Sequence, residues 1–252
     1  MQSPALTAQG TILGTFQYMS PEQIEGIDAD ARADIFAFGA LLFEMVTGQR
    51  AFSGKSQASL LAAILEREPP PVSQLVPIAP SSLDYLTMTV DDLVVCTLDG
   101  EVVEGHRSPT TEKALHLAAL RRYPEINATM HCHAKHCTMF ALTRRPIPAV
   151  IEEFVVYVGG DVPVAAYETT GTDELAEEVA GHVGDRSAVL MANHGLFAVG
   201  KNPADVMHIA GLVERTAEIV WGAQRLGDIV PLPPETNTQF AGYYRYGRTG
   251  KF

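Results

Sequence analysis

In the segment Ile126–His133, INATMHCH, residues typical of a β-strand lead into two histidines. His131 and His133 stand two residues apart, and side chains at that spacing in a strand point to the same face, so both imidazoles can reach one ion. A second apolar strand, Val189–Gly195 (VLMANHG), brings in His194, 61 positions after His133. Gly195 permits a tight turn there that leaves His194 projecting into a cleft.

Three imidazoles with an open fourth position are the usual ligand set of a catalytic divalent metal, and nitrogen ligands favour zinc over magnesium or calcium. His131, His133 and His194 are therefore candidate ligands of Zn²⁺. Taken alone, a His-x-His pair more often consists of ordinary surface or core histidines. The Asn-His-Gly that ends the second strand is the first observation that favours a metal site, and the residues upstream of the first strand are the second.

The segment Ser108–Glu112, SPTTE, predicts the start of a helix over 109–122, with a proline in the favoured first turn. Free backbone amides and the hydroxyls of Thr110 and Thr111 make this end suitable for an anion, and for a phosphate in particular. Glu112 either complements the helix dipole or is a carboxylate close to the metal that can act as a base. His116, one turn later on the same face, is either a further partner of the site or part of the core.

Composition limits the class of protein. The chain has 252 residues and carries 18 Lys+Arg against 30 Asp+Glu, a net charge of −12, with 46% hydrophobic residues. An acidic chain without a basic block argues against a nucleic-acid surface, and no apolar run approaches the ~18 residues of a membrane span. A secretory signal is not visible, and three cysteines (Cys96, Cys132 and Cys137) are too few for a disulfide framework. We expect a cytoplasmic protein that acts on small anionic molecules, with no nucleic-acid or membrane partner.

The chain has two halves of different composition. All eight histidines lie between His106 and His208, whereas the first 78 residues contain no His, Cys or Trp. The prolines at 69–71 predict a rigid, extended connector between the halves. The first half is expected to be helical: Ala33–Val46 is apolar on nearly every side and so belongs in a larger core, and Ser56 caps a second amphipathic helix.

Three motifs of the first half occur in the order and at the spacing of bacterial Ser/Thr protein kinases: Gly14–Gln23 (GTFQYMSPEQ), Asp34–Gly39 (DIFAFG) and Glu44–Gly48 (EMVTG). Residues 9–78 thus resemble the part of a kinase that follows the activation loop. The sequence has no Gly-rich loop, strand lysine, His-Arg-Asp loop or Asp-Phe-Gly metal site, which are the parts that position and neutralise the phosphates. We therefore expect a catalytically incomplete fragment of a kinase C-lobe.

Six motifs of the second half occur in the order of another family: Pro109–Glu112, His131–His133, Ile147–Ala149, Gly159–Asp161, Gly171–Thr172 and Asn193–Gly195. With them, residues from about 76 to 252 resemble the class II aldolase/adducin family, in particular its L-fuculose-1-phosphate aldolases and L-ribulose-5-phosphate 4-epimerases. The resemblance implies that His131, His133 and His194 bind zinc and that Glu112 is the acid/base carboxylate. The family also has a tyrosine in its C-terminal tail near the leaving aldehyde, for which Tyr243 is the candidate catalytic residue.

The resemblance also implies where the substrate phosphate binds. Thr110 and Thr111 would hold it at the start of the predicted helix. The turn Ile78–Ser82 is similar to the family's phosphate-binding Thr-Pro-Ser-Gly turn, which adds Ser81 and Ser82. The partner expected for the chain is therefore a small-molecule sugar phosphate.

The reaction implied by the resemblance is the zinc-dependent cleavage of a ketose 1-phosphate, such as L-fuculose 1-phosphate, to dihydroxyacetone phosphate and an aldehyde. An L-ribulose-5-phosphate 4-epimerase and an inactive, adducin-like scaffold are the alternatives. Two departures from the family concern activity. The segment Ile151–Phe154, which includes Glu152, stands where the fuculose-phosphate aldolases have a tyrosine, and the kinase-like segment replaces the N-terminal phosphate loop. We therefore expect a chain that binds zinc but is a feeble enzyme.

The expected fold class is α/β, with a mostly antiparallel central sheet and helices on both faces, preceded by a small helical kinase-like fragment. We divide the chain into domains 1–78 and 79–252. Helices are expected over 109–122, 134–143, 172–183 and 203–226, and strands over 93–98, 126–132, 154–158, 187–191 and 196–199. Members of the family are tetramers with sites between subunits, so a homo-oligomer is expected here.

Overall fold

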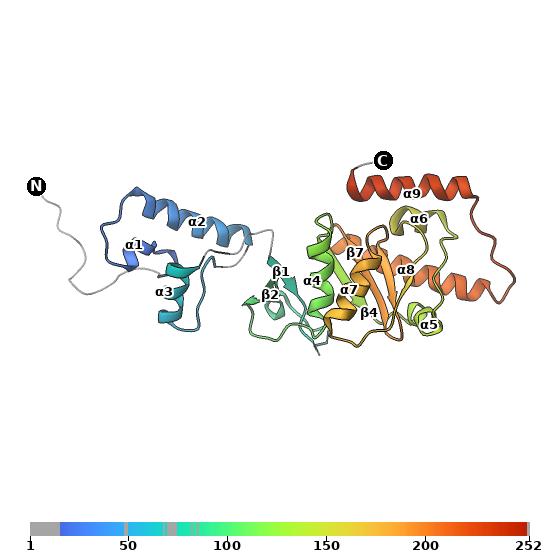
Figure 1. Ribbon diagram of the computed structural model, residues 1–252, viewed down its shortest axis with the longest axis horizontal. Coiled ribbons are helices and arrows are strands. Elements are labelled where there is room, and N and C mark those ends of the chain that lie inside the picture. The colour runs from blue at the N-terminus through green and yellow to red at the C-terminus, as the bar shows by residue number, and fades with distance from the viewer. Residues whose placement is uncertain are drawn as a thin grey trace, which may run out of the picture. The chain divides into compact units, whose positions relative to one another are not determined.

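The computed structural model describes residues 16–47, 50–67, 69, 75–81, 83–84 and 86–250 (Figure 1). Contacts between Cα atoms group the chain into two compact units, 1–108 and 109–252. The division into domains 1–78 and 79–252 follows family resemblance and stays a prediction. Gly14, Thr15, Gly48 and the prolines at 70 and 71 lie outside the described residues. Among the described helices, none is both long and apolar enough to cross a membrane.

The first unit contains helices and a small sheet. Its helical segments are η1 (Phe16–Tyr18), α1 (Pro21–Ile24), α2 (Ala31–Thr47), α3 (Gln57–Glu66) and η3 (Val90–Asp92). Its strands are β1 (Leu75–Ile78), β2 (Val94–Thr97) and β3 (Val102–Glu104), which pair antiparallel in that order. The strand predicted over 93–98 is therefore confirmed as β2.

Both helices predicted for the first half are present. α2 covers the predicted 33–46, and Ser56 caps α3, since its hydroxyl accepts a hydrogen bond from the Ser59 amide at 3.2 Å. α2 leaves large apolar side chains exposed, with Ile35 at 69% and Phe38 at 63%. This exposure agrees with the expectation that the helix belongs in a larger core than this unit builds.

The second unit is a four-stranded sheet covered by helices on both faces. Its strands are β4 (Ala128–Cys132), β5 (Val164–Ala165), β6 (Ala188–Met191) and β7 (Gly195–Gly200), in the order β4-β7-β6-β5. β7 pairs antiparallel with β4 and β6, and β5 runs parallel to β6. Its helices are α4 (Lys113–Arg122), α5 (Lys135–Thr143), α6 (Glu152–Val158), α7 (Asp173–His182), α8 (Pro203–Ala223) and α9 (Pro234–Thr249). The predicted α/β fold class is confirmed.

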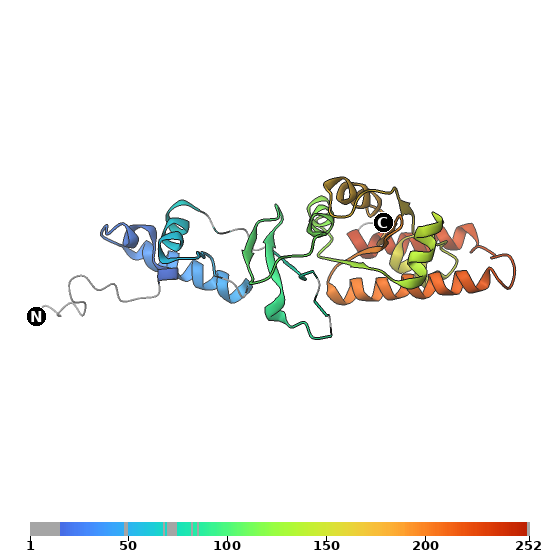
Figure 2. The same ribbon diagram turned by 90° about the horizontal axis from the view of Figure 1, so that it is seen from below.

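Alternate residues of the central strands hold the two helix layers. Val189 and Phe197 pack in the apolar cluster that includes α4 and α7, whereas Leu190 and Leu196 pack in the cluster that includes α5 and α8. Figure 2 shows α8 along the opposite side of the unit from α4 and α7. Because both faces are covered, every residue of β6 is buried, and the strand reads as a continuous apolar run.

The strand predicted over 154–158 is wrong, because this segment is helix α6. The β-branched and aromatic sequence FVVYV favours a strand locally. The buried residues, Phe154, Val155 and Val158, nevertheless follow helical spacing, and Gly159 ends the helix in the left-handed region with φ 95°. A Cβ at Gly159 would also lie 2.6 Å from the ring of Tyr244. Both the positive φ and the close packing therefore require glycine at this position.

Two further differences concern a helix boundary and a helix that was not predicted. The helix predicted over 109–122 begins only at Lys113, because the Lys113 amide donates to the carbonyl of Thr110 in a preceding turn. Pro109 therefore precedes the helix and is not in its first turn. No prediction covers α9, whose sequence is polar on average and rich in tyrosine and glycine, which are weaker helix formers.

Candidate metal centre

His131 is positioned by the sheet. It lies opposite Phe197 in the β4–β7 pairing and shares its face with Thr129, whose hydroxyl contacts His116 of α4 at 2.8 Å. The His131 Nδ1 donates a hydrogen bond to the Leu196 carbonyl at 3.1 Å. A carbonyl can only accept, so the proton of the neutral ring is on Nδ1 and the lone pair is on Nε2, as in a metal ligand.

His194 is positioned by the β6–β7 turn. Its amide donates to the Met191 carbonyl at 3.0 Å, and the residue before it, Asn193, is left-handed with φ 58°. Gly195 has no positive φ, so the tight turn does not depend on it as the sequence suggests. A Cβ there would lie 2.5 Å from the Cys132 carbonyl oxygen, and glycine is required because β7 passes so close to the end of β4.

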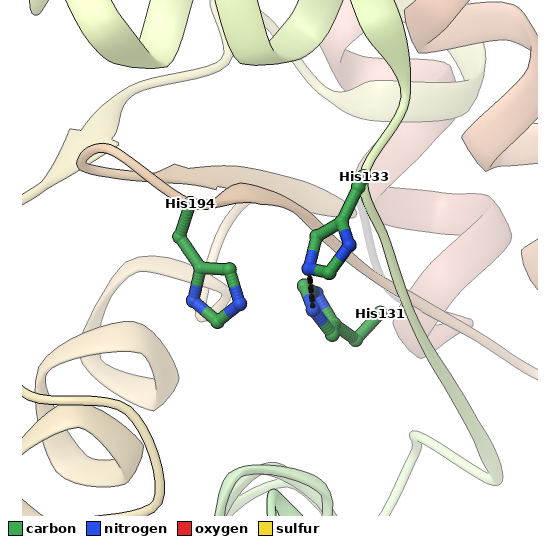
Figure 3. Close-up of side chains that lie close together, drawn as sticks. All are labelled: His131, His133 and His194. Atoms are coloured by element: carbon green, nitrogen blue, oxygen red, sulfur yellow. Dashed lines mark hydrogen bonds between the residues drawn. The ribbon is translucent and has the colours of Figure 1, made fainter. Parts of the chain in front are cut away.

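The three histidines converge (Figure 3). The Nε2 atoms of His131 and His133 are 3.1 Å apart, and the ring of His194 lies 4.6 Å from that of His131 and 5.1 Å from that of His133, centre to centre. One nitrogen of each ring lies within 4.8 Å of the others. The structure thus brings together the three residues for which the sequence predicts a shared metal ion.

Glu112 faces the same point from the N-cap position of α4. Its side chain is buried, at 7% exposure, and makes no capping hydrogen bond. One carboxylate oxygen lies 3.0 Å from the His131 Nε2, and the other lies 3.3 Å from the His194 Nε2. This second oxygen, Oε1, accepts no hydrogen bond. The geometry favours the carboxylate beside a metal over the alternative in which Glu112 only complements the helix dipole.

The charges at this point fit a bound cation. Burial, followed by the neighbouring imidazoles, lowers the pKa of His131 to about 3 although its bond to Leu196 opposes this shift, so the ring is neutral at pH 7. The lone pair on His131 Nε2 then faces a carboxylate oxygen at 3.0 Å, which is unfavourable for two acceptors unless a cation accompanies them. Two nitrogens bound to one tetrahedral zinc ion lie about 3.3 Å apart, close to the 3.1 Å between His131 and His133. These residues therefore fit a zinc ion.

The other predicted site residues are only partly gathered here. Thr110 is half-buried at the start of α4, where its hydroxyl accepts a hydrogen bond from the Glu112 amide at 3.3 Å, and Thr111 beside it is exposed. Ser81 is an exposed turn residue of the first unit, and Ser82 lies outside the described residues. The phosphate-binding role of all four stays a prediction.

Tyr243 is not brought to the triad of its own chain. It lies on α9, where its hydroxyl accepts a hydrogen bond from Gln239 at 2.8 Å. It also lines a pocket with Gly200, which is the opposite end of β7 from Gly195. The catalytic role of Tyr243 therefore stays a prediction.

One contact that shapes the site joins the end of α5 to the β6–β7 turn. Arg144, itself left-handed with φ 57° at the end of α5, donates a hydrogen bond to the side chain of Asn193. Asn193 directly precedes His194 in the β6–β7 turn. The two residues are 49 positions apart, so no local pattern of residues could indicate the contact.

We expect Asn193→Ala to lower the Tm by about 2–4 °C, the effect of roughly 1 kcal/mol in a domain of this size, since alanine disfavours the left-handed region. Asn193→Gly tolerates the positive φ and should keep a Tm closer to wild type. Both variants lose the contact with Arg144, so both should bind Co²⁺ about 10-fold more weakly. Thermal unfolding and cobalt titration check these outcomes, and wild-type affinity in the glycine variant would show that Arg144 does not help to hold His194.

Comparison with known proteins agrees with this geometry. Residues 60–221 match the family model described as the class II aldolase and adducin N-terminal domain. The chain belongs to the class II aldolase/adducin family. Residues 3–102 also match the protein kinase domain model, which agrees with the resemblance of the first half to a kinase and overlaps the aldolase match over 60–102.

Three similar proteins illustrate the range of this family. A 5-deoxy-D-ribulose 1-phosphate aldolase of Bacillus thuringiensis serovar kurstaki is 36% identical over 175 residues, which are 69% of this chain and 82% of that protein. An L-ribulose-5-phosphate 4-epimerase of Salmonella paratyphi B is 37% identical over 161 residues, 60% of this chain and 71% of that protein. The solved structure of an L-fuculose 1-phosphate aldolase superposes on this chain with a TM-score of 0.65 at 37% identity. The superposition covers 68% of this chain and 81% of the aldolase chain.

Proposed function

We propose that this chain is a zinc-dependent lyase that cleaves a ketose 1-phosphate, such as L-fuculose 1-phosphate, to dihydroxyacetone phosphate and an aldehyde. The observation that carries the proposal is the buried Glu112 carboxylate, which lies 3.0 and 3.3 Å from the ring nitrogens of His131 and His194. The names of two similar proteins, a ribulose 1-phosphate aldolase and a fuculose 1-phosphate aldolase, support this substrate class.

In this proposal some residues bind the metal ion and others transfer protons. His131, His133 and His194 would hold the ion, which would supply Lewis-acid polarisation of a carbonyl oxygen. In the cleavage direction the C4 hydroxyl loses its proton, the C3–C4 bond breaks, and the electron pair of that bond moves to C3. Glu112, in its acid form, then gives a proton to C3 and completes dihydroxyacetone phosphate. Tyr243 of another chain is the proposed acid/base at the C4 oxygen.

The phosphate of the substrate fixes its far end. Thr110 and Thr111 lie at the N-terminus of α4, where the helix dipole favours an anion, and Glu112 follows directly. A phosphate bound there places the reacting carbons near Glu112. Part of the binding energy of the phosphate is thus used to hold the substrate in the reactive orientation. A phosphate-binding role for Ser81 and Ser82 stays a prediction from the family resemblance. The tetramer and the cytoplasmic location stay predictions.

A 4-epimerase is the second candidate function, favoured by the 37% identity to an L-ribulose-5-phosphate 4-epimerase. An epimerase of this kind breaks the same type of bond but keeps the aldehyde and re-forms the bond on its other face. It would use the same ligands and the same carboxylate, so the metal centre alone does not distinguish the two reactions.

A panel of ketose phosphates tests the two functions. We expect the zinc-loaded chain to release dihydroxyacetone phosphate from a ketose 1-phosphate, measured by coupling to its reduction with NADH. The rate should be low and the KM high, because the kinase-like segment stands where the family has part of its phosphate loop. Interconversion of L-ribulose 5-phosphate and D-xylulose 5-phosphate without release would favour the epimerase. Absence of both reactions in a zinc-loaded chain would leave the inactive scaffold.

A further inference from the structure

The three proposed ligands, His131, His133 and His194, differ in how firmly neighbouring residues fix their side chains. His131 is fixed by strand pairing and by its bond to the Leu196 carbonyl, and His194 by the β6–β7 turn. His133 lies just beyond the end of β4 and is exposed. Within the described part of the chain, the one hydrogen-bond contact recorded for its ring is with His131. The position of His133 must therefore depend on how the backbone continues into α5.

That continuation is fixed from α8 by Glu214. The Glu214 carboxylate accepts hydrogen bonds from the backbone amides of His136 and Cys137, at 2.9 and 3.0 Å, and from the His136 Nδ1 at 2.8 Å. These are free amides in the first turn of α5, which normally bond to the side chain of the N-cap residue. The N-cap here is Ala134, which has no such group. Glu214 thus supplies the missing cap from 78 residues away along the chain.

Other features of Glu214 fit this role. Burial opposes ionisation, but the bonds from His136 and Cys137 outweigh it and lower the pKa of the carboxyl, so it is charged at neutral pH. A negative charge at a helix N-terminus is stabilised by the helix dipole. Cys137 is fully buried in the apolar core, and this packing also fixes the first turn of α5.

We infer that Glu214 is a positioning residue of the metal centre, which sets the path of residues 133–135 and so aims the His133 imidazole at the ion. This inference rests on the proposed function, since it gives His133 a metal to bind. It predicts that the loss of the Glu214 carboxylate changes metal affinity and coordination geometry, beyond any loss of stability. Glu214 itself is not one of the three proposed ligands.

The test is a Co²⁺ titration of the full chain, followed by its visible absorption spectrum, which reports coordination geometry. We expect Glu214→Ala to bind Co²⁺ about 10- to 100-fold more weakly, with an altered spectrum. Glu214→Gln retains one acceptor oxygen and should be intermediate, and it carries the test if the alanine variant does not fold. Glu214→Asp should recover part of the affinity, because it retains the charge.

Asn202→Ala is the matched control. Asn202 caps α8 by accepting the Asp205 amide at 2.9 Å, next to the end of β7 that lies opposite the triad. Because this variant also loses a helix cap, it should lower the Tm about as much as the Glu214 variants do. It should still bind Co²⁺ as the wild type does. Wild-type affinity and spectrum in Glu214→Gln and Glu214→Ala would overturn the positioning role and leave the proposed function intact. A wild-type chain that binds no stoichiometric Co²⁺ would overturn both.

Discussion

The His131→Ala variant is expected to lose its zinc, falling from about one ion per chain to less than about a tenth, because two remaining imidazoles cannot complete the coordination of a catalytic site. Lyase activity should disappear with the metal. The measurement is metal content by mass spectrometry after dialysis against metal-free buffer, with circular dichroism to show that the fold is retained. His133→Ala should give the same loss of zinc. Because the His133 side chain is exposed, its removal should not cause misfolding that would explain the loss.

His208→Ala is the control for the loss of an imidazole. His208 is exposed on α8, packs edge-on against the ring of Tyr157 at 4.7 Å, and is not part of the group of three ligands. It should retain zinc at the wild-type level. Stoichiometric zinc in His131→Ala, or its absence from the wild-type chain, would contradict a metal centre built on the three histidines.

The sequence predicts the fold best where local pattern and tertiary packing agree. β6 and β7 are readable because helices cover both faces of the sheet and make the strands wholly apolar, and α8 is readable because it keeps one apolar face for 21 residues. α6 is misread because its β-branched residues favour a strand, whereas packing against α8 and α9 and the left-handed Gly159 fix a helix. Local preference is weak compared with such packing.

The candidate site was predictable to the extent that it follows from strand geometry. The spacing of His131 and His133 places both on one face, and the family motifs add His194 and Glu112. The supporting contacts are a different matter. Arg144 reaches Asn193 across 49 positions and Glu214 reaches His136 across 78, and neither pair leaves a periodic or local signal. Such contacts depend on the packing of α5 against β7 and α8, which only the folded chain defines.

Glu112→Gln is expected to lower kcat by about 10²- to 10⁴-fold, the usual contribution of a general acid or base, with zinc still at about one per chain. Glutamine has nearly the same size and keeps one acceptor oxygen beside His131, but it cannot carry a proton to and from the substrate carbon. A change confined to kcat, with KM little altered, would show that the carboxylate acts in the transition state and not in binding. Steady-state kinetics and metal content on the same preparation provide both values.

Glu177→Gln is the matched control, because Glu177 is an exposed carboxylate on α7 whose partner, Arg122, is 3.9 Å away. It should leave kcat, KM and zinc unchanged. If Glu112→Gln instead keeps the wild-type kcat and loses only stability, the carboxylate serves the helix dipole, an effect of about 0.3–1 kcal/mol, and proton transfer belongs to another group. If it loses zinc together with activity, the carboxylate is itself a ligand of the ion. Only retained zinc with a lowered kcat assigns the proton transfer to Glu112, because this outcome separates the chemical step from the binding of the metal.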